Sequence, residues 1–257
     1  MNGTFYIGAT GLEAQQRALD VTANNIVNIN TPGFKRTAVR FSELVAMPNE
    51  EIDGPRVDAD PIAALAGVRM DPSHLIWAQG DLKTTGSSLD IAIDGSGFIE
   101  VLGSDGQVRL WRGGALKVNE DGFLATADGT ALRAMISVPT TASDLKIGTD
   151  GTVTALVDGD SAPEKLGQIE LVTVPDLDGL TTAGAGYFEN AAGAPANTVV
   201  PGEEGAGRIV QGAIEGSNVD LSDQMINLML LQRSYSANAQ LVQAGDQIMS
   251  ILNNLRK

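Results

Sequence analysis

Hydrophobic side chains recur at helical spacing near both ends of the chain. Close to the N-terminus, Leu12, Leu19 and Ile26 follow one another every seven residues, with partly polar positions between them. This spacing predicts a helix over residues 4–31. Residues 31–33 read Thr-Pro-Gly and should end the helix, because proline disfavours a helical residue before it and glycine permits a turn.

The last two turns of this predicted helix are rich in asparagine, at Asn24, Asn25, Asn28 and Asn30. Asparagine is a weak helix former because its side chain competes for backbone hydrogen bonds. The apolar stripe is also thin, so we expect the helix to need a partner.

A longer helix is predicted over residues 218–256, where residues 217–220 fit a capping box at its start. Its apolar stripe, with steps of three and four residues, consists of Ile226, Leu230, Ser234, Ala237, Leu241, Ala244, Ile248, Leu252 and Leu255. Leu228, Met229 and Leu231 lie off this stripe and widen the apolar surface. At 1.5 Å per residue the helix would be roughly 55 Å long. Its small stripe residues would admit a partner helix; the alternative is a helix lying on its own domain.

Between the two helices the pattern changes to short alternating runs. Such runs cover residues 89–93, 116–118, 145–147 and 153–157. Asp-Gly pairs, which are strong hairpin-turn signals, stand at 94–95, 105–106, 121–122, 128–129, 150–151 and 158–159. Several short strands at this spacing predict an irregular antiparallel barrel or sandwich.

The chain is therefore expected to be an α+β protein. Its N- and C-terminal helices would pair as a coiled coil, with the antiparallel β-rich body inserted between them. The expected segments are an N-terminal helix (1–35), an extended loop (36–70), an acidic β-rich body (71–200), a return linker (201–216) and a C-terminal helix (217–257). Within the loop, residues 46–67 hold three prolines and two glycines and are expected to form an extended or mobile excursion.

Charge is distributed unevenly along the chain. The first 40 residues carry a net charge of +2 and the last 40 are neutral, so the 177 residues between them carry −17 of the total of −15. An acidic body repels nucleic acid and anionic lipid surfaces, and it hinders close packing of one body against another. Self-association is therefore expected through the ends of the chain.

Candidate catalytic and metal-binding groups are few. Cysteine is absent, which excludes disulfides and thiolate metal sites. His74 is the single histidine, and Asp71 and Ser73 stand too close to it in sequence for a triad, so a surface or packing role is expected. Residues 95–97 read Gly-Ser-Gly without a following lysine and are interpreted as a turn between strands. Residues 90–95 lack the ligand spacing of a calcium loop. We expect no enzyme activity, no metal and no cofactor.

The sequence offers no membrane-spanning run, since no stretch approaches the eighteen or so apolar residues required. The first seven residues also lack the basic region and the apolar core of a cleaved secretion signal. The protein is expected to stay in the cytoplasm or to leave it by a route that needs no such signal.

Several motifs resemble a known family. Residues 19–36 read LDVTANNIVNINTPGFKR, which strongly resembles the signature of bacterial flagellar rod and hook proteins. The end of the chain is similar to the same family at 215–221 (EGSNVDL), 232–238 (QRSYSAN) and 246–249 (DQIM). Further landmarks match at 79–82, 89–98 and 147–153. One stretch departs from the family: residues 110–116 read LWRGGAL where a Tyr-Thr-Arg-x-Gly-x-Phe-like sequence is common.

The resemblance implies a structural subunit that is exported unprocessed by the flagellar type III apparatus into the periplasmic basal body. Its terminal helices would polymerise as an inner tube, in contact with neighbouring rod and hook proteins and inside the periplasmic and outer-membrane rings. It implies no nucleic acid and no small-molecule substrate. The side chains expected to carry assembly are Leu12, Leu19, Ile26, Asn24, Asn25, Asn28, Ile226, Leu230, Ala237, Leu241, Ala244, Ile248 and Leu252.

Within this family, chain length and residues 67–69 (GVR) before Gln79 favour a subunit of the distal rod, the drive shaft between motor and hook. A proximal rod or short hook-type subunit is the alternative, and residues 46–67 would be a rod-specific extension. Outside the family, two readings stay open: a secreted β-rich enzyme or adhesin with helical ends, and a coiled-coil scaffold unrelated to motility.

Overall fold

The structure of the protein, a computed structural model, describes residues 2–45, 65–71, 73–103, 106–157, 162–184, 186–190, 193, 195–203 and 205–255. The chain divides into two units. Unit 1 contains residues 1–27, 37–76 and 220–257, and unit 2 contains residues 28–36 and 77–219. Most of the predicted excursion over 46–67 lies outside the described residues, which resume at residue 65.

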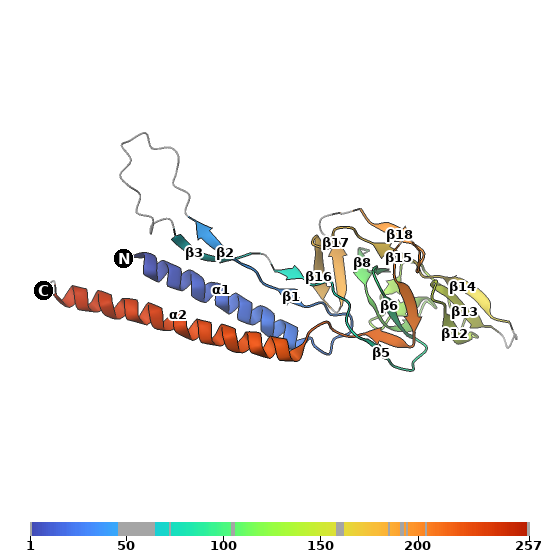
Figure 1. The fold of residues 1–257 in the computed structure, drawn as a ribbon. Coiled ribbons are helices and arrows are strands. Elements are labelled where there is room, and N and C mark those ends of the chain that lie inside the picture. The colour runs from blue at the N-terminus through green and yellow to red at the C-terminus, as the bar shows by residue number, and fades with distance from the viewer. Residues whose placement is uncertain are drawn as a thin grey trace, which may run out of the picture. The chain divides into compact units, whose positions relative to one another are not determined.

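Two helices dominate unit 1 (Figure 1). Helix α1 covers Asn2–Val27 and ends four residues before its predicted limit, because the chain turns at Asn28, where the Thr31 amide donates to the Asn28 carbonyl. Helix α2 covers Leu221–Leu255.

The start of α2 differs from the predicted capping box. Asp220 caps the helix, since its Oδ1 accepts from the amides of Ser222 (2.7 Å) and Asp223 (3.1 Å). The predicted cap, Ser217, instead accepts from the amide of Val219 two residues on. The prediction was wrong because the aspartate can bond two free amides at the first turn, whereas the serine lies one turn too early.

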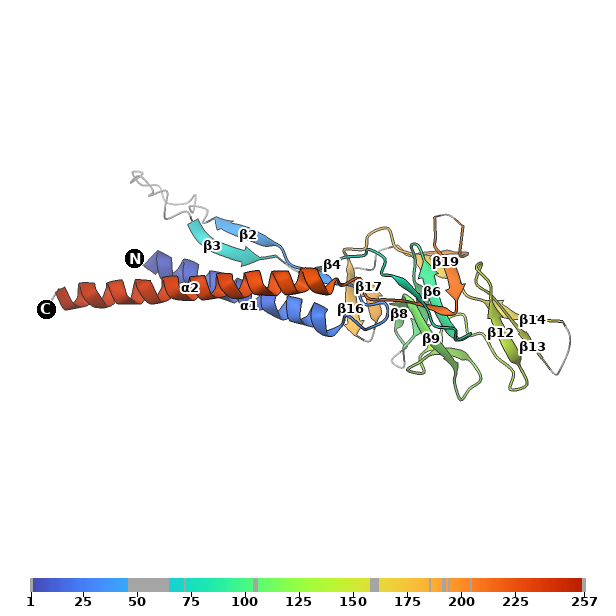
Figure 2. The same cartoon turned by 60° about the horizontal axis from the view of Figure 1, so that its bottom comes forward.

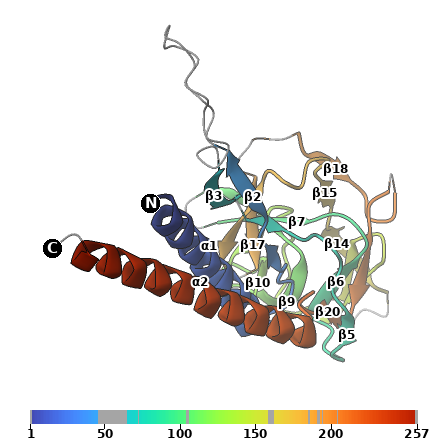
Figure 3. The ribbon, with the colours of Figure 1, turned by 60° about the vertical axis from the view of Figure 1, so that its left-hand side comes forward.

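Helices α1 and α2 lie side by side and run antiparallel (Figures 1, 2 and 3). Contacts that involve rising residue numbers in α1 involve falling numbers in α2. The last turns of α2 reach beyond the start of α1. Unit 1 also holds a ribbon of β2 (Phe41–Val45) and β3 (Leu65–Met70), with β3 packed against α1, and a short pair of β1 (Thr37–Ala38) and β4 (His74–Leu75).

Unit 2 is an antiparallel β-rich body, as predicted. Its largest sheet has nine strands in the order β16-β17-β8-β7-β11-β10-β9-β6-β19. In chain order these are β6 (Asp90–Asp94), β7 (Ile99–Leu102), β8 (Val108–Trp111), β9 (Gly113–Val118), β10 (Leu124–Thr126), β11 (Ala131–Leu132), β16 (Leu180–Gly184), β17 (Tyr187–Asn190) and β19 (Arg208–Gln211).

Smaller sheets complete unit 2. They are the three strands β12 (Ser143–Ile147), β13 (Thr152–Leu156) and β14 (Glu164–Gln168), the pair β15 (Leu171–Thr173) and β18 (Asn197–Val199), and the pair β5 (Leu82–Thr84) and β20 (Ala213–Glu215). Residues 201–216, predicted as a linker, therefore contain β19 and β20. Aliphatic side chains from the large sheet, β12, β13 and β15 form the core.

The Asp-Gly pairs mark turns, as their sequence predicts. Those at 121–122, 128–129 and 150–151 join strands that pair with each other, and each glycine has a positive φ. The pair at 94–95 connects β6 to β7, which are not neighbours in the sheet. Residues 95–97 are thus a turn between two strands, as interpreted from the sequence. Asp105 and the pair at 158–159 lie outside the described residues.

Candidate assembly surfaces and a buried ionic junction

The face that α1 turns toward α2 is built from small residues. A Cβ placed on Gly8 would come within 2.6 Å of Val242 Cγ2, and one on Gly11 within 3.0 Å of Asn238 Nδ2. Such distances leave no room for a side chain, so the two helices approach closely where these glycines lie.

A polar contact joins the same two helices near the other end of α1. Asn25 Nδ2 donates to Gln224 Oε1 at 3.2 Å and to the Thr37 carbonyl at 2.9 Å, while Asn25 Oδ1 accepts from the Thr37 amide at 2.9 Å. Asn25 and Gln224 are 2% and 3% exposed. A buried polar pair of this kind fixes the register of two helices, because any sliding leaves its groups unsatisfied.

Helix α1 also holds an unsatisfied polar atom. Gln15 Oε1 is buried and has no hydrogen-bond partner among the residues that the structure describes. A buried polar atom without a partner costs free energy, so this position weakens the packing of α1.

A second face of α2 is apolar and exposed. Ile226, Leu230, Leu241 and Ile248 are each more than half exposed, and Ala237 and Ala244 are exposed as well. These are the α2 residues that the sequence predicts for assembly; the side chain of Leu252 lies outside the described part. We call this set, from Ile226 to Ile248, the outer face of α2.

The outer face lies on the side of α2 away from α1. Gln224, which bonds to α1, precedes Ile226 by two positions, and Val242, which meets Gly8, precedes Ala244 by two. Two positions correspond to about 200° around a helix. Beyond the outer face, Ile251 and Leu255 are exposed on the turns of α2 that extend past α1.

The predicted residues of α1 lie in more varied places. Leu12, Leu19 and Ile26 are half-buried, and Asn24 is exposed. Asn25 belongs to the helix contact described above. Asn28 lies past the end of α1, where its Oδ1 accepts from Thr31 Oγ1 at 3.1 Å.

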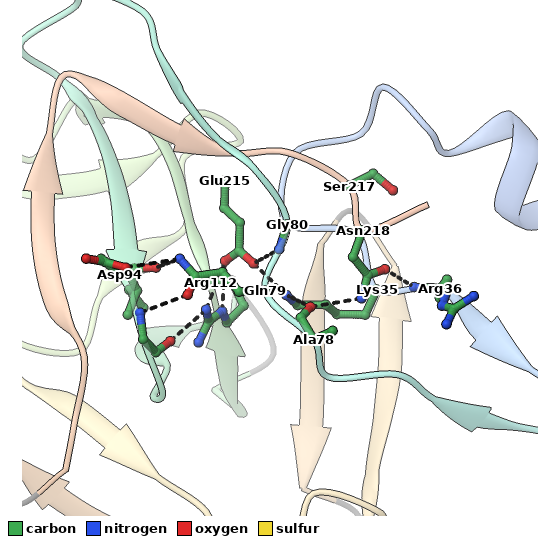
Figure 4. A network of polar contacts seen from close by, with 12 residues as sticks. Lys35, Arg36, Ala78, Gln79, Gly80, Asp94, Arg112, Glu215, Ser217 and Asn218 are labelled. Carbon is green, nitrogen blue, oxygen red and sulfur yellow. Dashed lines mark hydrogen bonds and ion pairs between the residues drawn. The ribbon is translucent and has the colours of Figure 1, made fainter. Parts of the chain in front are cut away.

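Unit 2 contains a network that the sequence did not predict (Figure 4). Lys35 Nζ donates to Glu215 Oε1 at 2.5 Å and to the Ala78 carbonyl at 2.9 Å. Arg112 Nε donates to Glu215 Oε2 at 3.0 Å. The three charged side chains are buried, with 1%, 6% and 1% exposure for Lys35, Arg112 and Glu215. We call these three residues the ionic junction.

Arg112 also holds the turn after β6. Its two terminal nitrogens donate to the carbonyls of Gly97 (2.6 Å) and Gly95 (3.0 Å). The Gly80 amide donates to Glu215 Oε1 at 2.9 Å. The junction thus connects the backbone of residues 78–80 with the turn at residues 95–97.

The chain segments that adjoin the two helices in sequence meet at this junction. The Gly33 amide donates to the Glu215 carbonyl at 2.9 Å. Asn218 Oδ1 accepts from the Arg36 amide at 2.7 Å, and Asn218 Nδ2 donates to the Ala78 carbonyl at 2.9 Å. Residues 33–36, which follow α1, are therefore fixed to residues 215–218, which precede α2.

In the junction the single carboxylate of Glu215 pairs with two cations, one of which, Lys35, has a shifted pKa. Burial lowers the pKa of Lys35 below its ordinary value, the nearby Arg112 lowers it further, and the attraction of Glu215 opposes both without reversing them. The junction is thus a site with more positive than negative charge inside an acidic body.

The sequence marked two of the junction residues only as parts of longer motifs. Lys35 and Glu215 belong to the motifs at 19–36 and 215–221, and Arg112 lies in the stretch that departs from the family pattern. Their mutual contact depends on segments up to 180 positions apart, which no local pattern reports.

The structure also places the remaining candidate groups from the sequence. His74 is half-buried in β4, where it is paired in register with Ala38. Across the described ranges, no group of three or more His, Asp and Glu residues is placed to hold a metal ion. Neither described helix is long and apolar enough to cross a membrane.

Three family models match separate parts of the chain. Residues 5–35 match the flagella basal body rod protein family, and residues 92–155 match the flagellar hook protein FlgE/F/G D1 domain. Residues 210–255 match the flagellar basal body rod FlgEFG protein C-terminal family. The matches include α1, the centre of the β body, and β20 with α2.

Curated relatives match over nearly their whole length. The flagellar basal-body rod protein FlgG of Agrobacterium fabrum is 36% identical over 96% of this chain and 97% of the relative. FlgG of Caulobacter vibrioides is 34% identical over 96% and 97%. FlgF of the same organism is 27% identical over 94% and 93%. The chain therefore belongs to the FlgG family of flagellar basal-body rod proteins, and it is a structural protein of the basal body and not an enzyme.

Proposed function

We propose that this chain is a subunit of the distal rod and polymerises through its terminal helices to form the drive shaft between motor and hook. The observation that carries the proposal is the outer face of α2. It is apolar, it runs along most of the helix, and α1 does not cover it.

Burial of the outer face supplies the free energy for assembly. Removing apolar surface from water contributes roughly 25 cal/mol per Å². Exposed apolar side chains gathered along one face of a helix mark an interaction site in a stable protein. Its steps of three and four residues suit a second helix packed in the manner of a coiled coil, and Ala237 and Ala244 permit close approach.

A second copy of this chain is the proposed occupant of the face. In such a contact the outer face of one copy lies against different residues of the next, so the contact is heterologous and can repeat without closing. The half-buried Leu12, Leu19 and Ile26 on α1 are proposed to complete the surface that receives it.

The assignment to the distal rod is supported by the comparison with relatives of one organism. This chain is 34% identical to the Caulobacter FlgG and 27% identical to its FlgF. We infer that neighbouring rod and hook proteins, the surrounding rings and the type III export apparatus are its partners.

The ionic junction fixes the chain segments that adjoin the two helices in sequence. Residues 33–36 and 215–218 bond to each other and to Ala78, all within unit 2.

The decisive test replaces Leu241 or Ile248 by glutamate in the full chain. Both side chains are exposed, so folding should be retained, and a buried charge should prevent assembly. Gln243→Glu, which adds the same charge at an exposed site off the outer face, is the matched control. Sedimentation of the purified chain under assembly conditions measures the outcome.

The same variants are then examined in a bacterium that lacks the wild-type chain. We expect Gln243→Glu to restore hook formation and swimming, and Leu241→Glu to restore neither. Normal rods built from Leu241→Glu subunits would refute assembly through this face.

A further inference from the structure

A cavity of about 270 Å³ opens beside the ionic junction, within unit 2. Lys35 and Arg112 form part of its wall, together with the turn at residues 95–97. Trp77 and Phe98 form an aromatic part of the wall, with their ring centroids 5.4 Å apart. The cavity is large enough for an entire side chain and small enough to be selective.

The chemistry of this wall favours an anion. Lys35 and Arg112 share the single carboxylate of Glu215. Asp94, which joins the network through Gln79, is half-exposed and lies 3.9 Å from another cation, Arg208. A buried cation without its own counter-charge is costly, so one further negative charge in the cavity would be stabilising.

The wall also offers hydrogen-bond donors. The amides of Ser96 and Gly97 donate to no acceptor in the part of the chain that the structure describes. Trp77 Nε1, in contrast, already donates to the Leu177 carbonyl at 3.1 Å. Free backbone amides beside two cations form a suitable environment for a carboxylate.

We propose that this cavity receives the carboxylate of an aspartate or glutamate from the β body of a second copy. The inference rests on the assembly proposed above and adds a contact between bodies to the contact between helices. The residues of unit 2, 28–36 and 77–219, carry a net charge of −10, so neighbouring bodies repel each other over most of their surface. At the cavity, Lys35 and Arg112 of one copy would attract a carboxylate of the next copy. This contact would therefore fix the position of one body against the next.

The first experiment measures the pKa of Lys35 by NMR on the full chain with isotope-labelled lysine. In the free chain, acetate replaces chloride at constant ionic strength as a probe of the cavity. We expect acetate to raise the pKa of Lys35. Assembly without acetate should raise it by about one unit, as a nearby opposite charge does.

The second experiment closes the cavity. Ser96 is exposed at its wall, so Ser96→Trp should fill the mouth without entering the core, and Ser96→Glu should supply a carboxylate from within the same chain. We expect both variants to raise the concentration needed for assembly about tenfold, as the loss of a charged hydrogen bond would. Thr181→Glu and Thr181→Trp, on an exposed position of β16, are the matched controls and should leave it unchanged.

The outcomes separate this inference from the proposed function. If Leu241→Glu blocks assembly while both Ser96 variants assemble at the wild-type concentration, the helices polymerise and the cavity inference is overturned. An acetate effect in the free chain without any change on assembly would mean that the cavity takes free small carboxylates, which also overturns a second copy as occupant. Unfolding in urea, followed by tryptophan fluorescence, shows that each variant is folded.

Discussion

At the scale of single residues, Glu215 is the group on which the ionic junction depends. Its two oxygens accept from Lys35, Arg112 and the Gly80 amide. Glu215→Gln would leave two buried cations without a counter-charge. Breaking a buried pair in this way costs about 3–5 kcal/mol, and we expect a loss of that order in the free energy of unfolding of unit 2.

Urea unfolding measures this loss, because both tryptophans, Trp77 and Trp111, lie in unit 2. Glu189→Gln is the control. Glu189 pairs with Arg109 at 3.2 Å in a partly exposed bridge, and such bridges contribute about 1 kcal/mol or less. Equal losses of unfolding free energy in the two variants would show that the buried junction contributes no more stability than the partly exposed bridge.

Lys35 gives the protein an unusual response to alkali. Its pKa is lowered in the folded state, chiefly by burial. Between that lowered pKa and the ordinary pKa near 10.5, the unfolded chain binds more protons than the folded one. Stability should therefore rise with pH across this interval, and the gain is lost as pH falls through the folded pKa.

The contribution of Lys35 is isolated by comparison with Lys35→Met. This variant keeps the Arg112–Glu215 pair and should lack the rise in its urea midpoint at alkaline pH. Lys165→Met, at an exposed position, should keep the wild-type slope. A Lys35→Met slope identical to that of the wild type would contradict the assignment to Lys35.

At the scale of elements, the two helices show what sequence periodicity can and cannot report. Both were predicted, with ends correct to within four residues. The periodicity highlighted the large apolar side chains, such as Leu241, which lie on the outer face of α2. The contact between the helices instead uses Gly8, Gly11 and Asn25, and a glycine or asparagine contributes nothing to a hydrophobic pattern.

For the β body, the sequence predicts the strands and turns but not the order of the strands. Alternating runs and Asp-Gly pairs located strands and turns, because side-chain direction and turn geometry are local properties. The order of the nine strands was not predictable, since β6 pairs with β9 and β19 instead of its sequence neighbour β7. The three members of the ionic junction lie after α1 (Lys35), between β8 and β9 (Arg112) and in β20 (Glu215). Contact between such distant segments depends on tertiary folding, which no local sequence pattern reports.

Replacing Gly8 tests the close helix contact. Helix propensity predicts that the replacement stabilises α1, whereas a clash with α2 predicts that it destabilises α1. On an isolated helix, Gly8→Ala should stabilise by about 1 kcal/mol through helix propensity. Here the added Cβ would meet Val242 Cγ2 at 2.6 Å. We therefore expect lower protection of α1 amides from hydrogen exchange.

A second substitution makes the test specific. Val242→Ala removes the clashing methyl groups, so Gly8→Ala with Val242→Ala should recover protection relative to Gly8→Ala alone. Because the two side chains touch, the effects should be strongly non-additive. Additive effects, or a gain of protection in Gly8→Ala, would indicate that the helices do not rely on this approach.

At the scale of the whole molecule, charge and apolar surface are divided between different parts of the chain. The acidic residues are concentrated in 41–217, while most of the large exposed hydrophobic side chains among the described residues lie on α2. On the proposed assembly, the acidic part keeps copies apart and the apolar face of α2 draws them together. The balance between them depends on ionic strength, because screening shortens electrostatic range to about 8 Å at physiological salt.

Raising the salt concentration should accordingly speed self-association of the free wild-type chain. Light scattering at low and at high sodium chloride measures the rate. Leu241→Glu should show a much smaller salt effect, since weaker repulsion cannot promote a contact that the variant no longer makes. A wild-type rate that is independent of salt would indicate that body charge plays no part in keeping copies apart.

The bare outer face of α2 also limits how long a folded copy remains usable. On the assembly proposed above, a chain that waits in solution exposes the strip that it buries in the polymer, so any encounter with another waiting copy competes with addition to a growing end. Encounters between free copies increase with the square of their concentration, whereas addition to an end increases in direct proportion. Productive growth therefore favours few free copies at a time, each delivered close to the end that it extends.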